Sequence, residues 1–346
     1  MGTYKGIQGY RVESLASDPG TISEVIGKVW YNSGSNVWKV GVEGPGSWSA
    51  APTLNEARAS AGYSGTSNTS ALIFGGNTDY PFSLPGESEQ YNGTSWTQVN
   101  AQQAARMNTG GQGTATAALC WGGQTFTGGV PGLTPSVNCE SWNGTSWAEL
   151  AGDLPANRNN CAGAGGPAAP TAALCIGGGP EPVGRTCVLW NGTSWADDAL
   201  MSAGASGTMG CGTSTAALCI GGSPTPRSND TEEFNGTSWT IVNPANNNRV
   251  AGGASGTTTA ALQFGGYDSN MPDPTDTATA NVEKWNGTAW TEVANIAVRA
   301  TTTGGCSISS TATMKIGGYS GPPEIYYNYT EEWQDPVIGA KTITTS

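Results

Sequence analysis

The chain has 346 residues with a formal net charge of −12, 52 glycines, 13 tryptophans and no histidine. The lack of histidine excludes Ser-His-Asp and Cys-His catalysis and every metal site with histidine ligands, and the acidic balance disfavours a nucleic-acid surface. The sequence contains no run of 18 apolar residues, so it predicts no membrane-spanning helix. The charged fraction is only 12% and the tryptophans are regularly spaced, which predicts short strands and turns rather than disorder.

Residues 1–45 differ in pattern from the rest and are predicted to form an N-terminal extension. Met1–Gly6 lacks the apolar segment of a secretory signal peptide. Residues 27–40 hold two alternating segments around an Asn-Ser-Gly-Ser turn, which predicts a small hairpin. Two roles stay open for the extension: a hairpin that packs on the rest of the chain, or an anchor that attaches the chain to a larger particle.

Residues 46–335 contain six copies of one repeat, with a period of 44 to 55 residues. An apolar string that ends in Gly-Gly occurs at 71–76, 118–123, 173–178, 217–222, 261–266 and 313–318. A string built on an aromatic residue, Asn-Gly and tryptophan follows at 89–96, 140–147, 188–195, 232–239, 283–290 and, truncated, at 331–333. An arginine precedes the Gly-Gly string at 58, 106, 158, 249 and 299, with Ala205 at the fourth place.

Each copy predicts four short strands. A strand of small and polar residues precedes the apolar string, which is typical of a buried strand. The aromatic-Asn-Gly sequence predicts a hairpin with positive φ at both turn residues, and the return strand opens with the second tryptophan. Six such copies predict an all-β, six-bladed β-propeller with four strands per blade.

The two ends of the repeat region are predicted to complete one blade together. The sixth copy reaches Trp333 but lacks the second tryptophan, and Trp48 is the unmatched copy. We therefore expect the N-terminal strand that carries Trp48 to close the last blade, since closure removes exposed strand edges. Residues 336–346 are predicted to form one strand or a tail.

These motifs resemble the kelch repeat of β-propellers, and the resemblance covers residues 46–335. The strings TAAL-x-φ-GG and E-x-W-NGTSW are in addition similar to kelch-like virion and tail proteins of tailed phages, especially marine ones. Residues 27–34 resemble segments near the start of phage tail and fibre proteins. The phage resemblance implies a virion protein that is made in the host cytoplasm and released by lysis, so that it needs no export signal.

Three recurrent features allow both a structural and a chemical interpretation. The arginines and the glutamates of the second string recur in five of six copies, which favours a scaffold role over a binding site. The Asn-Gly-Thr strings match the glycosylation sequon, but a turn explains them. Cys120 with Cys139, and Cys175 with Cys187, occupy equivalent positions in consecutive copies. Each pair is either a cross-strand disulfide or two buried thiols, and we favour the thiols.

The loops between Gly-Gly and the next aromatic residue break the symmetry, because this interval varies from 13 to 20 residues. Variable loops on a rigid scaffold are where recognition usually occurs. The binding candidates in these loops are Tyr80, Phe82, Phe126, Arg185, Arg227, Tyr267, Asp268, Tyr319, Tyr326 and Tyr327. Aromatic and acidic side chains suit the stacking and hydroxyl contacts of a carbohydrate. Asp268, Asp273 and Asp276 form a weak candidate for a Ca²⁺ site, although their spacing matches no EF-hand.

The sequence favours a non-enzymatic virion protein without a cofactor, on the tail, fibre or capsid surface of a tailed phage. We expect it to be oligomeric or particle-bound, with other virion proteins and a host-surface glycan as partners, and without nucleic-acid or membrane contacts. The alternative is a non-viral, lectin-like propeller with an extracellular site of action. An enzyme of the galactose-oxidase or sialidase kind ranks third, because the first needs histidine and the second an arginine cluster distinct from the repeat.

Overall fold

The structure is a computed structural model that describes residues 13–19, 27–43, 46–79, 83–126, 132–179, 183–203, 206–223, 228–268, 278–305, 308–321, 324–335 and 338–343. Contacts divide the chain into two compact units: Met1–Ser47 with Asp335–Ser346, and Trp48–Gln334. The described segments contain β-strands and two 3-10 helices, η2 (Gly166–Ala168) and η3 (Val183–Arg185), and no α-helix. None of their helices has the length and apolar character needed to cross a membrane. The prediction of an all-β protein is confirmed.

Six four-stranded sheets account for the repeats, in agreement with the predicted four strands per copy. Sheet 1 contains β5 (Gly62–Ser67), β6 (Ser70–Phe74), β7 (Ser88–Tyr91) and β8 (Trp96–Val99). Sheet 2 contains β9 (Gly110–Gly113), β10 (Ala118–Trp121), β13 (Cys139–Trp142) and β14 (Trp147–Glu149). Sheet 3 contains β15 (Ala162–Ala164), β16 (Ala173–Ile176), β17 (Cys187–Trp190) and β18 (Trp195–Asp197).

Sheet 4 contains β19 (Met209–Thr213), β20 (Ala216–Gly222), β21 (Ser228–Phe234) and β22 (Trp239–Val242). Sheet 5 contains β24 (Gly253–Thr257), β25 (Ala260–Phe264), β27 (Val282–Trp285) and β28 (Trp290–Val293). Sheet 6 contains β29 (Gly304–Gly305), β30 (Met314–Ile316), β33 (Thr330–Gln334) and β4 (Ser47–Ala51). Its outer strand, β4, therefore comes from the opposite end of the repeat region.

Short two-stranded ladders extend three of the variable loops. They are formed by β11 (Gln124–Phe126) with β12 (Leu133–Pro135), β23 (Arg249–Val250) with β26 (Tyr267–Asp268), and β31 (Tyr319–Ser320) with β32 (Ile325–Tyr326). The last two ladders carry three of the predicted binding tyrosines.

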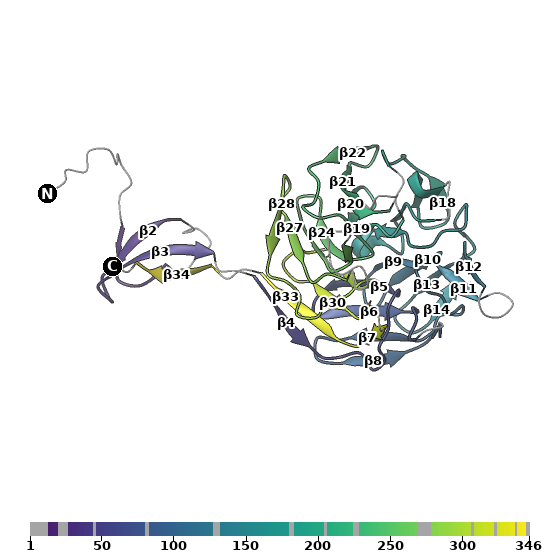
Figure 1. Cartoon of the computed structure of the whole chain (residues 1–346), viewed down its shortest axis with the longest axis horizontal. Coiled ribbons are helices and arrows are strands. Elements are labelled where there is room, and N and C mark those ends of the chain that lie inside the picture. Colours follow the sequence, from purple (N-terminus) through teal and green to yellow (C-terminus); the bar gives the residue numbers. More distant parts are fainter. Residues whose placement is uncertain are drawn as a thin grey trace. The chain divides into compact units, whose positions relative to one another are not determined.

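The innermost strands contact one another in the cyclic order β5, β9, β15, β19, β24, β29 and back to β5. In the second unit of Figure 1, β5, β9, β19 and β24 lie near a common centre, while outer strands such as β8 and β22 lie at the periphery. A second cycle joins the segments just before these strands. Each segment donates a backbone N–H to the carbonyl of the previous one, and the six donor–acceptor distances are 2.6 to 3.1 Å.

Aromatic side chains fill the space between neighbouring sheets. Trp147, on the outer strand of sheet 2, contacts Phe74 of sheet 1 with ring centroids 4.8 Å apart, and its Nε1 donates to Ser88 Oγ of sheet 1. Trp48 occupies the same place on β4, where it lies 5.2 Å from Phe264 of sheet 5 and 5.5 Å from Trp333 of its own sheet. The recurrent second tryptophan is thus an inter-sheet contact.

The Asn-Gly turns differ from the prediction. Tyr91 pairs with Trp96, so Asn92 to Ser95 form a four-residue loop rather than a two-residue turn. Positive φ occurs at Gly93 (90°) but not at Asn92. The asparagine instead uses its side chain: Asn92 Oδ1 accepts the N–H groups of Thr94 and Ser95, each at 2.9 Å. The same arrangement recurs at Asn143, Asn191, Asn235 and Asn286.

The first unit is a separate sheet with the strand order β1 (Glu13–Leu15), β2 (Val29–Asn32), β3 (Val37–Glu43) and β34 (Ile338–Thr342). The β2–β3 pair is an antiparallel hairpin, and β34 pairs antiparallel with β3. Asp18 Oδ1 accepts hydrogen bonds from Trp30 Nε1 at 3.2 Å and Asn32 Nδ2 at 2.7 Å. The two chain ends, which the sequence analysis treats as separate segments, thus belong to one unit.

Candidate functional site

Four of the five recurrent arginines, Arg58, Arg106, Arg158 and Arg249, are buried. Arg299 is exposed, so its predicted equivalence to the other four is wrong. Ala300 occupies the equivalent place, because its carbonyl accepts from Gly266 N as the carbonyl of Arg106 accepts from Gly76 N.

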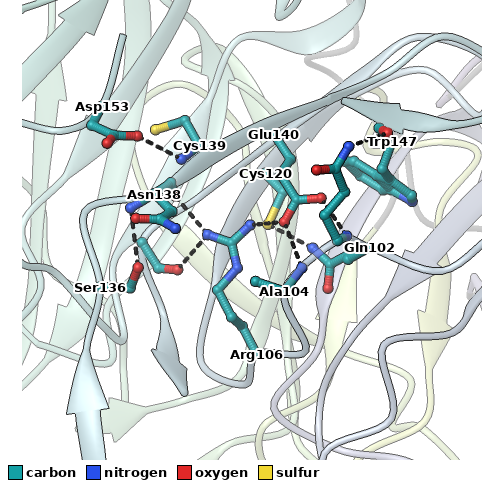
Figure 2. Close-up of polar contacts among 12 residues, drawn as sticks. Gln102, Ala104, Arg106, Cys120, Ser136, Asn138, Cys139, Glu140, Trp147 and Asp153 are labelled. Atoms are coloured by element: carbon teal, nitrogen blue, oxygen red, sulfur yellow. Dashed lines mark hydrogen bonds and ion pairs between the residues drawn. The ribbon is translucent and has the colours of Figure 1, made fainter. Parts of the chain in front are cut away.

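Arg106 donates to the carbonyl oxygens of Gly122 (3.1 Å) and Asn138 (2.5 Å) and to Glu140 Oε1 (2.6 Å). The contacts of Arg106 with Asn138 and Glu140 can be followed in Figure 2. Glu140 also accepts the backbone N–H of Gln103 at 2.8 Å. The pair therefore ties the segment that enters sheet 2 to two strands of that sheet. Arg58 with Glu89 and Arg249 with Glu283 form equivalent pairs.

Sheets 3 and 4 each lack one residue of this ion pair. In each of them the remaining arginine or glutamate forms hydrogen bonds with other groups of the protein. In sheet 3, Val188 replaces the glutamate, and Arg158 donates to Thr186 Oγ1 at 2.6 Å. In sheet 4, Glu232 accepts the N–H groups of Ser202 and Ala203, while Ala205 lies outside the described residues. These contacts are those of a scaffold, and they leave the arginine and glutamate side chains away from solvent.

The candidate disulfides do not fit the strand register. Cys120 pairs with Glu140, whereas Cys139 pairs with Trp121. Paired residues point to the same face and successive residues to opposite faces, so Cys120 and Cys139 lie on opposite faces of sheet 2. The same offset separates Cys175 from Cys187 in sheet 3.

The seven cysteines within the described segments are buried free thiols, and Cys306 lies outside these segments. Burial raises the pKa of Cys120 to about 11 and that of Cys139 to about 12. Because the thiolate is the reactive form, these two thiols are poor nucleophiles near neutral pH. Their place in apolar clusters is that of small core residues.

The predicted Ca²⁺ site has one described member. Asp268 is 3% exposed and pairs in register with Arg249, so it faces the scaffold rather than an open loop. Asp273 and Asp276 lie outside the described residues. Within the described part of the chain, no group of three or more cysteine, aspartate or glutamate side chains could hold a metal ion.

Three predicted binding residues, Tyr267, Tyr319 and Tyr326, come together at a cavity of about 480 Å³. Tyr319 and Tyr326 are stacked with centroids 5.7 Å apart, and the hydroxyl groups of Tyr267 and Tyr319 are in contact. Asn77 Nδ2, from the loop of sheet 1, donates to the Tyr326 hydroxyl at 2.8 Å. Loops of sheets 5, 6 and 1 therefore form one continuous wall of the cavity.

The floor of the cavity is the cycle of six backbone hydrogen bonds. Its members have left-handed backbone conformations, with φ between 47° and 65°, and they are Ser60, Asn108, Asn160, Gly207, Ala251 and Thr302. This conformation turns each N–H toward the carbonyl of the preceding member. Glycine and asparagine adopt it most readily, which accounts for three of the six residues. Asn108 and Asn160 line the cavity from the two sheets opposite the tyrosines in the cycle.

A second cavity, of about 130 Å³, lies among the six inner strands and is lined by the same six residues of the hydrogen-bond cycle. Helix η2 follows the third inner strand, β15, and contacts β5, β9 and β19. Since β5 and β19 belong to sheets on opposite sides of the cycle, η2 lies across the space between the inner strands.

Burial raises the pKa of Tyr326 to about 12, and the nearby Glu324 carboxylate adds to the effect. Burial also raises the pKa of Tyr319. Both phenols are therefore protonated near neutral pH and can donate hydrogen bonds. Among the described lining residues, Glu324 alone carries a charge.

The other predicted residues that the structure describes do not line this cavity. Phe126 lies half-buried on β11. Arg185 donates its Nε and Nη2 to the carbonyl oxygen of Met201. The hydroxyl of Tyr327 contacts Ser320 Oγ at 2.6 Å, and its ring lies 5.7 Å from Lys315 Nζ. Tyr80, Phe82 and Arg227 lie outside the described residues.

The polar half of the site was not predicted from the sequence, and it consists of Asn77, Asn108, Asn160 and Thr302. Asn108 and Asn160 stand two residues after a recurrent arginine. Asparagine adopts positive φ more readily than most residues. Its presence at this position of the repeat therefore predicts a left-handed backbone conformation there. No sequence signal links Asn77 to Tyr326, which is 249 positions away.

Comparison with known proteins identifies a similar fold. No family model and no curated protein matches the sequence. Among solved structures, that of YjhT is similar, with a TM-score of 0.64 and 12% sequence identity over 85% of this chain and 99% of YjhT. At this identity the similarity concerns the fold alone.

Proposed function

We propose that Trp48–Gln334 is a six-bladed β-propeller of the kelch type, in which β4 closes the last blade. Four observations support the proposal: six four-stranded sheets, cyclic contacts of the inner strands, the backbone hydrogen-bond cycle, and the repeat of arginine, Gly-Gly and tryptophan. The architecture leaves only the short edges of the outer strands unpaired in the second unit.

We further propose that the protein is a non-enzymatic recognition component of a tailed-phage particle, on its tail, fibre or capsid surface. The observation that carries the recognition role is the cavity of about 480 Å³, which lies in the size range of small-molecule sites and combines an aromatic wall with polar groups. Its ligand is a glycan of the host surface. The likeness of the repeat strings to phage virion proteins supports the location, and the first unit is the proposed attachment to other virion proteins.

Particles that carry the double substitution Tyr319→Ala and Tyr326→Ala test this role. We expect adsorption to host cells to fall at least tenfold while the amount of the protein per particle stays unchanged. Tyr329→Ala is the matched control, because Tyr329 is 48% exposed and lies outside the cavity. Unchanged adsorption of the double variant contradicts host recognition. Particles that lose the protein instead indicate a structural role for these loops.

A non-viral, lectin-like propeller is the second candidate, and the same cavity supports it. Neighbouring genes for tail or capsid proteins distinguish the two, since only the virion role requires them. An enzyme ranks third, because three of the recurrent arginines, Arg58, Arg106 and Arg249, are enclosed in the scaffold pairs described above.

A further inference from the structure

We propose that Cys161 and Cys175 form a redox-active thiol pair, which a peroxide oxidises to a disulfide within sheet 3. Cys161 immediately precedes β15 and is the thiol that reacts with the peroxide, while Cys175 lies on β16 and is the thiol that closes the bond. The inference does not depend on the recognition role proposed above, because it concerns the core of sheet 3 rather than the tyrosine cavity.

The strand register places the two thiols side by side. Gly163 of β15 pairs with Cys175, and Cys161 stands two residues before Gly163, so both cysteines lie on the same face of sheet 3. Sheet 4 has Thr208 and Cys219 at the equivalent places, and their Oγ1 and Sγ atoms are 2.9 Å apart. In sheet 3 the Cys175 thiol donates a hydrogen bond to Cys161 Sγ. A disulfide therefore requires that two sulfur atoms already in contact close to about 2.0 Å.

A buried cation without a carboxylate lies beside the pair. Val188, which pairs with Cys175, stands in the place that a glutamate occupies in sheets 1, 2 and 5. Within the described segments, Arg158 donates to oxygen atoms of Gly177 and Thr186 and has no carboxylate partner. A guanidinium that no carboxylate neutralises favours the charged form of a nearby thiol.

The two thiols differ in acidity and in access. The hydrogen bond from Cys175 lowers the pKa of Cys161 against the opposing effect of burial, and Arg158 adds to the lowering. Burial raises the pKa of Cys175. Cys161 is 8% exposed and lines the cavity of about 130 Å³ among the inner strands, whereas Cys175 is 0% exposed. Because the thiolate is the nucleophile, Cys161 is the thiol that a molecule as small as hydrogen peroxide oxidises first.

The oxidation proceeds in two steps. The Cys161 thiolate attacks one oxygen of hydrogen peroxide, the O–O bond breaks, hydroxide leaves, and Cys161 becomes a sulfenic acid. The Cys175 sulfur then attacks the Cys161 sulfur, the S–O bond breaks, and the hydroxyl group leaves with the Cys175 proton as water. The two thiols together lose two electrons and two protons, and one peroxide is reduced to two water molecules.

The test exposes the folded full chain to hydrogen peroxide, removes the excess with catalase, and alkylates the remaining thiols in urea for mass spectrometry. The sequence has eight cysteines, and we expect two of them to escape alkylation after oxidation and to recover it after reduction. The disulfide-linked peptides should join Cys161 to Cys175. Cys161→Thr, which gives sheet 3 the residue type that sheet 4 has at Thr208, should leave every remaining thiol open to alkylation.

Val188→Glu tests the role of the charge. The new carboxylate gives Arg158 the partner that the arginines of other sheets have, and we expect disulfide formation to become at least tenfold slower. Val188→Gln is the matched control without a charge and should slow it less than threefold. Full alkylation of the oxidised chain, or a disulfide that joins any other cysteines, overturns the inference. So does equal slowing by the two Val188 variants, because the uncompensated arginine would then play no part.

Discussion

Buried ion pairs at the recurrent arginine positions join the connecting segments to the sheets that follow. The Arg106 and Glu140 side chains are 0% and 2% exposed, and the glutamate also holds two backbone N–H groups. A buried pair contributes little net stability compared with apolar residues, but removing one partner leaves an uncompensated charge. The pairs are therefore sensitive positions for folding.

Replacing Glu140 by leucine should accordingly lower the free energy of unfolding by about 3–5 kcal/mol, because the Arg106 guanidinium stays buried without its partner. Urea unfolding followed by tryptophan fluorescence measures the change. Glu149→Leu is the control on the same sheet, since Glu149 is exposed and should change the free energy by less than about 0.5 kcal/mol. Equal effects of the two substitutions would rule out the scaffold role.

Lys315 gives the protein a specific pH dependence. It is 0% exposed, with its Nζ 4.0 Å from Glu331 Oε1. Burial lowers the pKa of Lys315 from 10.5 to about 8, against the opposing effect of Glu331. Between pH 8 and 10.5 the unfolded chain binds more protons at this site than the folded chain, so stability rises with pH in this window. Below pH 8 both states are protonated and the site contributes no slope.

We therefore expect the unfolding free energy of the unaltered protein to gain a few kcal/mol between pH 8 and 10 relative to Lys315→Met. Urea unfolding of both proteins at pH 7.5 and at pH 10 measures this difference. The other titrating groups contribute equally to the two proteins, so their contributions cancel. A difference of zero, or one of opposite sign, would show that the Lys315 ammonium is not destabilised by burial.

Strand β4 joins the two ends of the repeat region, because it comes from the start of this region and pairs with β33 from its end. It supplies the outer strand of sheet 6, and Trp48 packs on Trp333 and Phe264. The sequence could predict this because one tryptophan was missing at the end of the repeats and one was unmatched at the start. It could not predict the turn geometry, since a side-chain hydrogen bond of asparagine replaces the expected backbone conformation.

A truncation that removes β4 should open sheet 6 and yield insoluble protein, because β33 then presents a free edge. The informative comparison is between residues 52–335 and residues 47–335. The longer variant keeps β4 and lacks the first unit, so it should stay soluble and cooperative in thermal unfolding. Equal solubility and equal melting temperatures would mean that β4 is dispensable for closing the sheet.

At the scale of the whole molecule, the fold class follows from local patterns and the cavity does not. The six copies of the repeat share one sequence pattern, and each copy forms the same local structure. The pattern therefore predicts the strands and their connections. The cavity arises where loops from different sheets meet, and Asn77 reaches Tyr326 only because sheet 1 follows sheet 6 in the cycle. Loop aromatics could therefore be proposed one by one, but three converge and others, such as Phe126 and Arg185, make different contacts.

If the cavity binds a glycan as we propose, a lining whose described residues include no lysine or arginine implies weak single contacts, and binding by the particle would then depend on many copies. Linking sites on one particle raises avidity by about 10²- to 10⁴-fold without new contacts. We expect the isolated chain to bind glycan-coated surfaces with fast dissociation. The same chain fused to a trimeric or larger carrier should dissociate at least 100-fold more slowly, a gain that Tyr319→Ala with Tyr326→Ala removes. Surface plasmon resonance at low and high glycan density measures both rates. If the carrier gives no gain at high density, the cavity does not act through avidity, and a second, stronger contact must attach the particle.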